Sequence, residues 1–169
     1  MFGIHLHHDE EQNDNLNHIP HLYHDQHDML EAIKKLNFNK YEHLIMSTLV
    51  ARSQDIVVVD TDRKKNDTYV HIIRTFWDIN LPIRILFRIT RQEIKNADID
   101  AIRNELYACE LCVIITTELI NQDIIDKARE HNEVPVALVD GKFLGKTLMD
   151  DKFADLFHNC WDKSEDADQ

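Results

Sequence analysis

Glycine and proline are scarce in this sequence, with three of each among 169 residues. Glycine-rich loops that cradle phosphate groups are therefore not expected, and neither GxGxxG nor GxxxxGK followed by Ser or Thr occurs. The three cysteines are an odd number without a signal-peptide pattern, which suggests a reducing compartment. No apolar run reaches the length of a membrane-spanning helix. The sequence therefore predicts a soluble cytoplasmic protein that does not contact a membrane.

Basic residues are also in short supply, because 19 Lys and Arg stand against 31 Asp and Glu and give a net charge of -12. Affinity for nucleic acid of any sequence comes from neutralising phosphates with Lys and Arg, so a broad nucleic-acid surface is not expected. The only basic run is Arg63, Lys64 and Lys65, where a local basic groove is the alternative. An acidic surface instead favours protein partners with basic surfaces.

Residues 1–27 differ from the rest, since they hold seven of the eleven histidines and lack sustained periodicity. They predict a mobile histidine-rich arm, followed by one domain at 28–160 and an acidic tail at 161–169. If the end of the arm is helical, His21, His24 and His27 share a face and could bind Zn²⁺ or Ni²⁺. The simpler interpretation is a polar arm that binds metal weakly and adventitiously.

Hydrophobic periodicity from Asp28 onward predicts the order α-α-β-β-β-α-β-α-β-α, with Asp28 and Asn39 as the first two helix caps. Short links between the first three strands favour an antiparallel meander, and the later strands add parallel partners. The expected strands are Asp55–Asp60, Tyr69–Trp77, Ile83–Thr90, Cys112–Glu118 and Pro135–Gly141, with helices at about Asp98–Ala108, at Asn121–Asn132 and from Lys142.

The third strand, "IRILFRIT", has one fully apolar face and one face that carries two arginines. Its arginine-bearing face consists of Arg84, Leu86, Arg88 and Thr90, because side chains alternate along a strand. This face is expected to be solvated or salt-bridged to some of the many acids. Binding of an anion or phosphate by the two arginines is the alternative.

Two stretches resemble Mrr-like restriction endonucleases of the PD-(D/E)xK superfamily. "YEHLIMSTLV" is similar to the opening helix of that family, and "CVIITTELINQDIIDKAREHNEVPVALVDGKFLGKTL" is similar to its C-terminal half. The resemblance spans roughly Tyr41 to Leu148. It implies an α/β fold, a restriction-endonuclease-like mixed sheet flanked by helices.

The resemblance also implies where a metal-dependent nuclease site would lie. The family places an Asp on the second strand, and a Glu or Gln, a spacer and a Lys on the third. At these positions this chain has His71, Leu86 and Arg88, of which Leu86 cannot bind a metal and Arg88 cannot release a proton. The degenerate site positions, including the nearby acids Glu42 and Asp67, are therefore expected to hold no catalytic residue.

The function predicted from the sequence is a non-catalytic protein-protein interaction module derived from a nuclease-like fold, as a subunit of a larger assembly. Trp77, Phe157 and Trp161 are the expected partner-binding residues, because tryptophans are enriched among binding hot spots. For the C-terminal pair the alternative is a helix that closes the domain's own core. Cys109 and Cys112 are expected to be buried filler and not a zinc or redox pair.

Two other functions are kept as alternatives. The first is a divergent metal-dependent nuclease that uses Asp67, Glu42 or Asp60 as ligands, with Asp62 as a further acid nearby. The second is metal handling through the histidine-rich arm. No cofactor is expected apart from Zn or Ni at that arm.

Overall fold

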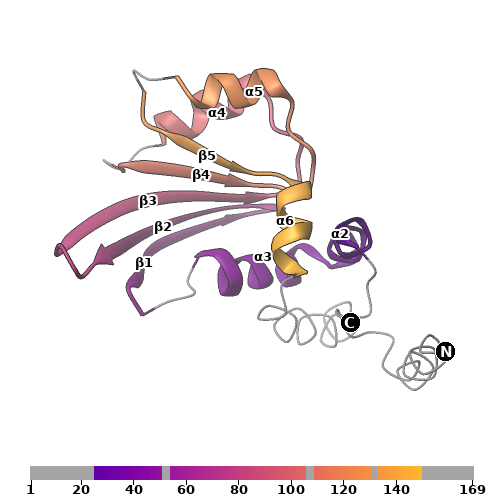
Figure 1. Ribbon diagram of the computed structural model, residues 1–169, viewed down its shortest axis with the longest axis horizontal. Coiled ribbons are helices and arrows are strands. Elements are labelled where there is room, and N and C mark those ends of the chain that lie inside the picture. Colours follow the sequence, from indigo (N-terminus) through magenta and orange to yellow (C-terminus); the bar gives the residue numbers. More distant parts are fainter. Residues whose placement is uncertain (1–24, 51–53, 106–108, 131–132, 150–169) are drawn as a thin grey trace, which may run out of the picture.

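The computed structural model describes residues 25–50, 54–105, 109–130 and 133–149, and everything below concerns those residues (Figure 1). Their element order agrees with the predicted order, with a short π-helical turn, η3, added after the second helix. The elements are α2 (Gln26–Lys35), α3 (Phe38–Ile45), η3 (Met46–Val50), β1 (Ile56–Lys64), β2 (Asp67–Phe76), β3 (Leu81–Thr90), α4 (Asn96–Asn104), β4 (Leu111–Ile115), α5 (Gln122–Ala128), β5 (Val136–Val139) and α6 (Gly141–Leu148).

The first two helices begin slightly before their expected caps. The side chain of Asp25 accepts a hydrogen bond from the Asp28 amide (2.9 Å), and Asn37 accepts one from the Lys40 amide (2.9 Å). An N-cap keeps an extended backbone and reaches forward to the first helical turn, and Asp25 and Asn37 do both. The expected caps Asp28 and Asn39 were wrong, because both lie inside the first turn.

The sheet runs in the order β1-β2-β3-β4-β5. Strands β1, β2 and β3 pair antiparallel, and β3, β4 and β5 pair parallel, which confirms the predicted meander followed by parallel additions. The stretch expected to be a short, turn-like link between β1 and β2 is mostly strand, and the chain reverses at Lys65 and Asn66. Asn66 has a φ of 59°, a left-handed conformation that asparagine tolerates in tight hairpin turns.

Helices cover both faces of the sheet (Figure 1). On the α3 face, the sheet and helices α2, α3 and α6 bury one apolar cluster, which includes Tyr41, Ile72, Phe87 and Leu144. On the α4 face, a second cluster joins Leu86 and Cys112 of the sheet to Ile94 and to residues of α4 and α5. The mixed sheet is therefore the middle layer of a three-layer α/β domain.

Helix α6 lies unusually close to its neighbours at two glycines. A Cβ atom on Gly141 would sit 2.1 Å from the carbonyl oxygen of Thr117, and one on Gly145 would sit 2.5 Å from that of Gln26. Both contacts are with backbone, which cannot swing away as a flexible side chain can. The glycines thus permit the close contact between α6, the start of α2 and the loop after β4.

One end of the sheet projects beyond the helices, where β1 begins and the β2–β3 hairpin turns (Figure 1). Seven of the nine exposed large hydrophobic residues among the described ones lie at this end. We call them the apolar ribbon: Val57, Val58, Val59, Phe76, Trp77, Ile79 and Leu81. Within the part of the chain that the structure describes, no helix is both long and apolar enough to span a bilayer.

Candidate functional site

Arg88 is the centre of the candidate site, and it lies almost completely buried, with 4% of its surface exposed. The alternation of β3 points it to the α4 face, the same side as Leu86. The sequence predicts that one face of β3 carries Arg84, Leu86, Arg88 and Thr90. The packing is consistent with this prediction, because the residues of the opposite face, Ile85, Phe87 and Ile89, belong to the apolar cluster on the α3 face. Arg84 is exposed, whereas Arg88 is covered.

Two carboxylates and an amide hold the guanidinium of Arg88. Its Nε and Nη2 atoms donate to the two oxygens of Asp67, each at 3.0 Å, in a bidentate pair. Its Nη1 donates to Asp98 Oδ1 at 2.6 Å, and Nη2 also donates to Gln92 Oε1 at 3.3 Å. The predicted salt bridge on this strand is therefore confirmed for Arg88. We call Arg88, Asp67 and Asp98 the arginine clamp.

Each carboxylate of the clamp is fixed by its own element. Asp67 opens β2 immediately after the tight turn, and the register places its neighbour Tyr69 opposite Arg88. Asp98 stands in the first turn of α4, where its second oxygen accepts the Lys95 amide at 2.7 Å. A carboxylate there is also favoured by the positive end of the helix dipole. Sequence reasoning missed Asp98, although its position at a helix start is a signal for a fixed carboxylate.

The clamp stabilises the charged form of the arginine. Burial by itself would lower the pKa of the Arg88 guanidinium, but the hydrogen bonds to Asp67 and Asp98 and their negative charges outweigh burial. The pKa of Arg88 is therefore raised above its already high ordinary value. Such a group cannot act as a general acid or base at any physiological pH.

The positions beside Arg88 surround only a small hollow. Leu86 is 1% exposed and packs in the α4-face core, and His71 pairs with it across the strands. The hollow in front of these two residues measures about 20 Å³, room for about one water molecule. Leu86 supplies no ligand atom to this hollow, and its other lining residues Asp60, Asp62, His71 and Glu105 are not placed as a metal-holding group among the described residues.

Glu42 lies on the other side of the sheet. Its carboxylate is buried and accepts from Arg63 Nε at 2.8 Å and from the Thr68 hydroxyl at 2.9 Å. Because Thr68 follows Asp67 in β2, their side chains point to opposite faces, and Glu42 is separated from the clamp. Within residues 25–50, 54–105, 109–130 and 133–149, no group of three or more His, Cys, Asp or Glu side chains is placed to hold a metal ion.

The cysteine pair is part of the core. Cys109 and Cys112 are both buried in the α4-face cluster, as predicted. Burial, with the nearby Cys109 thiol, raises the pKa of Cys112 to about 12, and Arg103 only partly opposes this. A thiol that stays protonated is a poor nucleophile and a poor metal ligand.

The remaining predicted residues are spread over the molecule. Trp77 is 66% exposed at the end of the β2–β3 hairpin, and its indole donates to Asp55. His27 belongs to α2 and is exposed. The other predicted residues, His21, His24, Phe157 and Trp161, lie outside the described residues.

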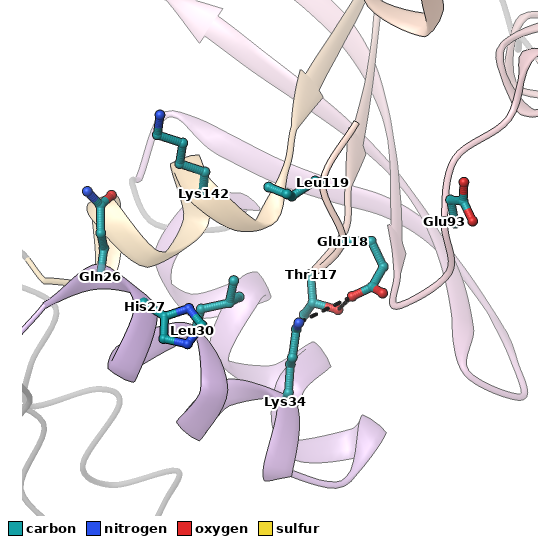
Figure 2. Close-up of a pocket in the computed structure, with 9 residues that line it drawn as sticks. All are labelled: Gln26, His27, Leu30, Lys34, Glu93, Thr117, Glu118, Leu119 and Lys142. Atoms are coloured by element: carbon teal, nitrogen blue, oxygen red, sulfur yellow. Dashed lines mark hydrogen bonds and ion pairs between the residues drawn. The ribbon is translucent and has the colours of Figure 1, made fainter. Parts of the chain in front are cut away.

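A separate cavity of about 550 Å³ opens at the carboxyl ends of β4 and β5, between α2 and α6 (Figure 2). Leu30 and Leu119 supply its apolar surface, and Lys34 pairs with Glu118 at 3.6 Å. Figure 2 shows the side chain of Lys142 extending away from Lys34, so its two lysines do not converge on one point. The cavity therefore does not have the geometry of a site for a small ion.

Comparisons with known proteins bear on the fold. No protein-family model matches the chain, and no curated protein sequence matches it significantly. The solved structure of the DNA modification-dependent restriction endonuclease AspBHI is similar, with a TM-score of 0.59 and 10% identity over 91% of this chain. A second solved structure, MspJI Restriction Endonuclease in Complex with 27-mer Oligonucleotide, gives a TM-score of 0.48 and 12% identity over 95% of this chain.

This chain spans less than half of each endonuclease, 42% of the first and 35% of the second. At such low identity, the likeness to AspBHI bears on the arrangement of helices and strands and not on chemistry. The comparison and the mixed sheet lead to the same conclusion: the chain has the restriction-endonuclease-like fold.

Proposed function

We propose that this protein is a non-catalytic protein-binding module built on a nuclease-like fold, and that it acts as a subunit of a larger assembly. The observation that carries the proposal is the arginine clamp. Asp67 is one of the acids that a divergent nuclease would use as a metal ligand, and both of its oxygens already accept from Arg88 at 3.0 Å. A metal ion would have to displace this buried, bidentate pair.

The charges around the clamp also argue against a phosphodiester substrate. Asp60, Asp62 and Glu105 line the small hollow beside Leu86, and they add to the charges of Asp67 and Asp98. Arg88 and Lys64, which pairs with Asp62 at 3.7 Å, offset only two of these five carboxylates, so the local charge is negative. A DNA phosphate would be repelled there, and nuclease sites counter this repulsion with metal ions or cationic side chains.

The binding half of the proposal rests on the apolar ribbon. Contiguous exposed apolar surface on a soluble protein commonly marks a protein-protein interaction site. Trp77 lies in the ribbon with 66% of its surface exposed, and tryptophan is among the residues most enriched at binding hot spots.

A cleavage assay tests the loss of catalysis. The purified protein is incubated with duplex and single-stranded DNA, modified and unmodified, in the presence of Mg²⁺ or Mn²⁺. We expect no cleavage in any combination. Metal-dependent cleavage that disappears in Asp67→Asn would overturn the proposal, provided that it persists in Asp123→Asn, a matched change at an exposed acid of α5 that belongs neither to the clamp nor to the hollow.

A further inference from the structure

Strand β1 begins at the edge of the sheet with three exposed valines in a row. Val57, Val58 and Val59 are 61%, 39% and 50% exposed, and β1 pairs only with β2 among the described strands. Half-buried edge strands usually alternate apolar and polar residues, whereas an unbroken apolar run is typical of a strand that is covered on both sides. This part of β1 thus has the sequence of an interior strand and the position of an edge strand.

The same end of the molecule carries little net charge for an acidic protein. Segments 54–59 and 72–84, which carry the apolar ribbon, contain two acids, Asp55 and Asp78, and two arginines, Arg74 and Arg84. Glu110, which accepts a hydrogen bond from the Arg84 amide, adds a third acid. The whole chain has a net charge of -12. A strongly basic partner would not be complementary in charge to this end of the molecule. A surface with the same mixture of charges would be complementary, because each arginine can then face an acid of the other copy.

We propose that the apolar ribbon binds a second copy of this chain, through antiparallel pairing of the two β1 strands about a two-fold axis near Val58. This inference names the partner of the binding surface and rests on the proposed function as a protein-binding module. Such a contact is isologous, so the axis places Val57 of one copy opposite Val59 of the other. It also gives the valine run its missing neighbour and removes an exposed sheet edge.

The geometry of β1 sets a limit to this pairing. The register with β2 shifts between Val58 and Asp60, and such a bulge bends the strand. The extra residue of the bulge is Val59, the last of the three valines, so β1 changes direction before its acidic part, which carries Asp60 and Asp62. Pairing is thereby confined to the neutral, apolar part of the strand.

The position of the ribbon also reduces charge repulsion between the copies. It lies at the end of the sheet that projects away from α2 and α6 (Figure 1). Charges farther apart than about 8 Å are largely screened at physiological ionic strength. An end-to-end dimer therefore keeps the acidic bodies apart, whereas contact through other surfaces would bring them together.

Sedimentation equilibrium of the full chain tests the proposal. We expect the wild type to be a reversible dimer, and Val57→Lys and Val57→Glu each to raise its dissociation constant at least about a hundredfold. An equal mixture of the two variants should associate again, because opposite charges then meet near the axis. Leu119→Lys is the matched control, an exposed apolar residue outside the ribbon (69% exposed), and it should dimerise like the wild type.

Thermal melts confirm that each variant is folded, and Ile79→Lys, in the hairpin turn, replaces Val57→Lys if the latter does not fold. A monomeric wild type, or dimers that persist in every ribbon variant, would overturn the inference. A mixture of charge variants that stays monomeric would overturn the pairing of β1 strands. None of these outcomes changes the result expected in the cleavage assay. The two experiments therefore distinguish a wrong dimer proposal from a wrong proposal of non-catalytic function.

Discussion

Arg88 shows how a charged residue is accommodated in the interior of a small domain. Removing a guanidinium from water costs several kcal/mol, and this cost is offset only when the geometry of its partners is good. Here Asp67 accepts two hydrogen bonds and Asp98 a third at 2.6 Å. Arginine suits this position better than lysine, because its planar fork matches a carboxylate in a bidentate pair.

Replacing Arg88 with alanine should destabilise the fold strongly, since Asp67 and Asp98 would keep their charges without their partner. We expect a loss of about 3 kcal/mol in the free energy of unfolding, measured by urea denaturation. Arg84→Ala is the matched control on the same strand face, where the side chain is exposed, and it should change stability by less than about 0.5 kcal/mol. Equal, small losses in both variants would show that the clamp contributes little.

At the scale of helices and strands, the sequence correctly predicted the features that depend on the local hydrophobic pattern. The apolar faces of Met29 and Ile33 in α2 and of Ile99 and Ile102 in α4 follow the helical period and are buried. Boundaries were less accurate, as in β1, which was expected to end at Asp60 and continues to Lys64. The charged residues of "TDRK" looked like a turn, but cross-strand pairing with β2 keeps them extended.

The candidate site could be predicted only in part, because its contacts join distant segments. The sequence identified Arg88 and suggested an ion pair, yet nothing local indicated that Asp67 and Asp98 would be the partners. Which acid reaches Arg88 depends on the β2–β3 register and on where α4 crosses the sheet. The separation of Glu42 from the clamp likewise follows from side-chain alternation in β2 once the strand register is known.

The two glycines of α6 should be intolerant of any side chain. Gly141→Ala and Gly145→Ala would each force a methyl group against a backbone carbonyl, at 2.1 Å and 2.5 Å in the present geometry. We expect each to lower the free energy of unfolding by about 2 kcal/mol, despite the better helix propensity of alanine. Lys146→Ala, at an exposed position of the same helix, should have almost no effect. Thermal or urea denaturation of the three variants checks this, and a stabilised Gly145→Ala would contradict it.

At the scale of the whole molecule, the negative charge determines what we expect of its interaction with nucleic acids. With a net charge of -12, we expect no mobility shift of duplex DNA at micromolar protein and physiological salt. The basic run Arg63 to Lys65 does not offset this, since Arg63 is already paired with Glu42. A complex that forms at low salt and weakens steeply as salt rises would show that a local basic surface overrides the total charge.

The sheet order has a consequence for how the chain folds. Each strand pairs with the one that precedes it in sequence, so the sheet can grow strand by strand while the chain is synthesised. Each step closes either a short hairpin turn or a single crossover through α4 or α5. Only the contact between α2 and α6 joins the first and last described helices, and it must wait until α6 has emerged. Folding is therefore expected to end with the docking of α6, and unfolding to begin with its release.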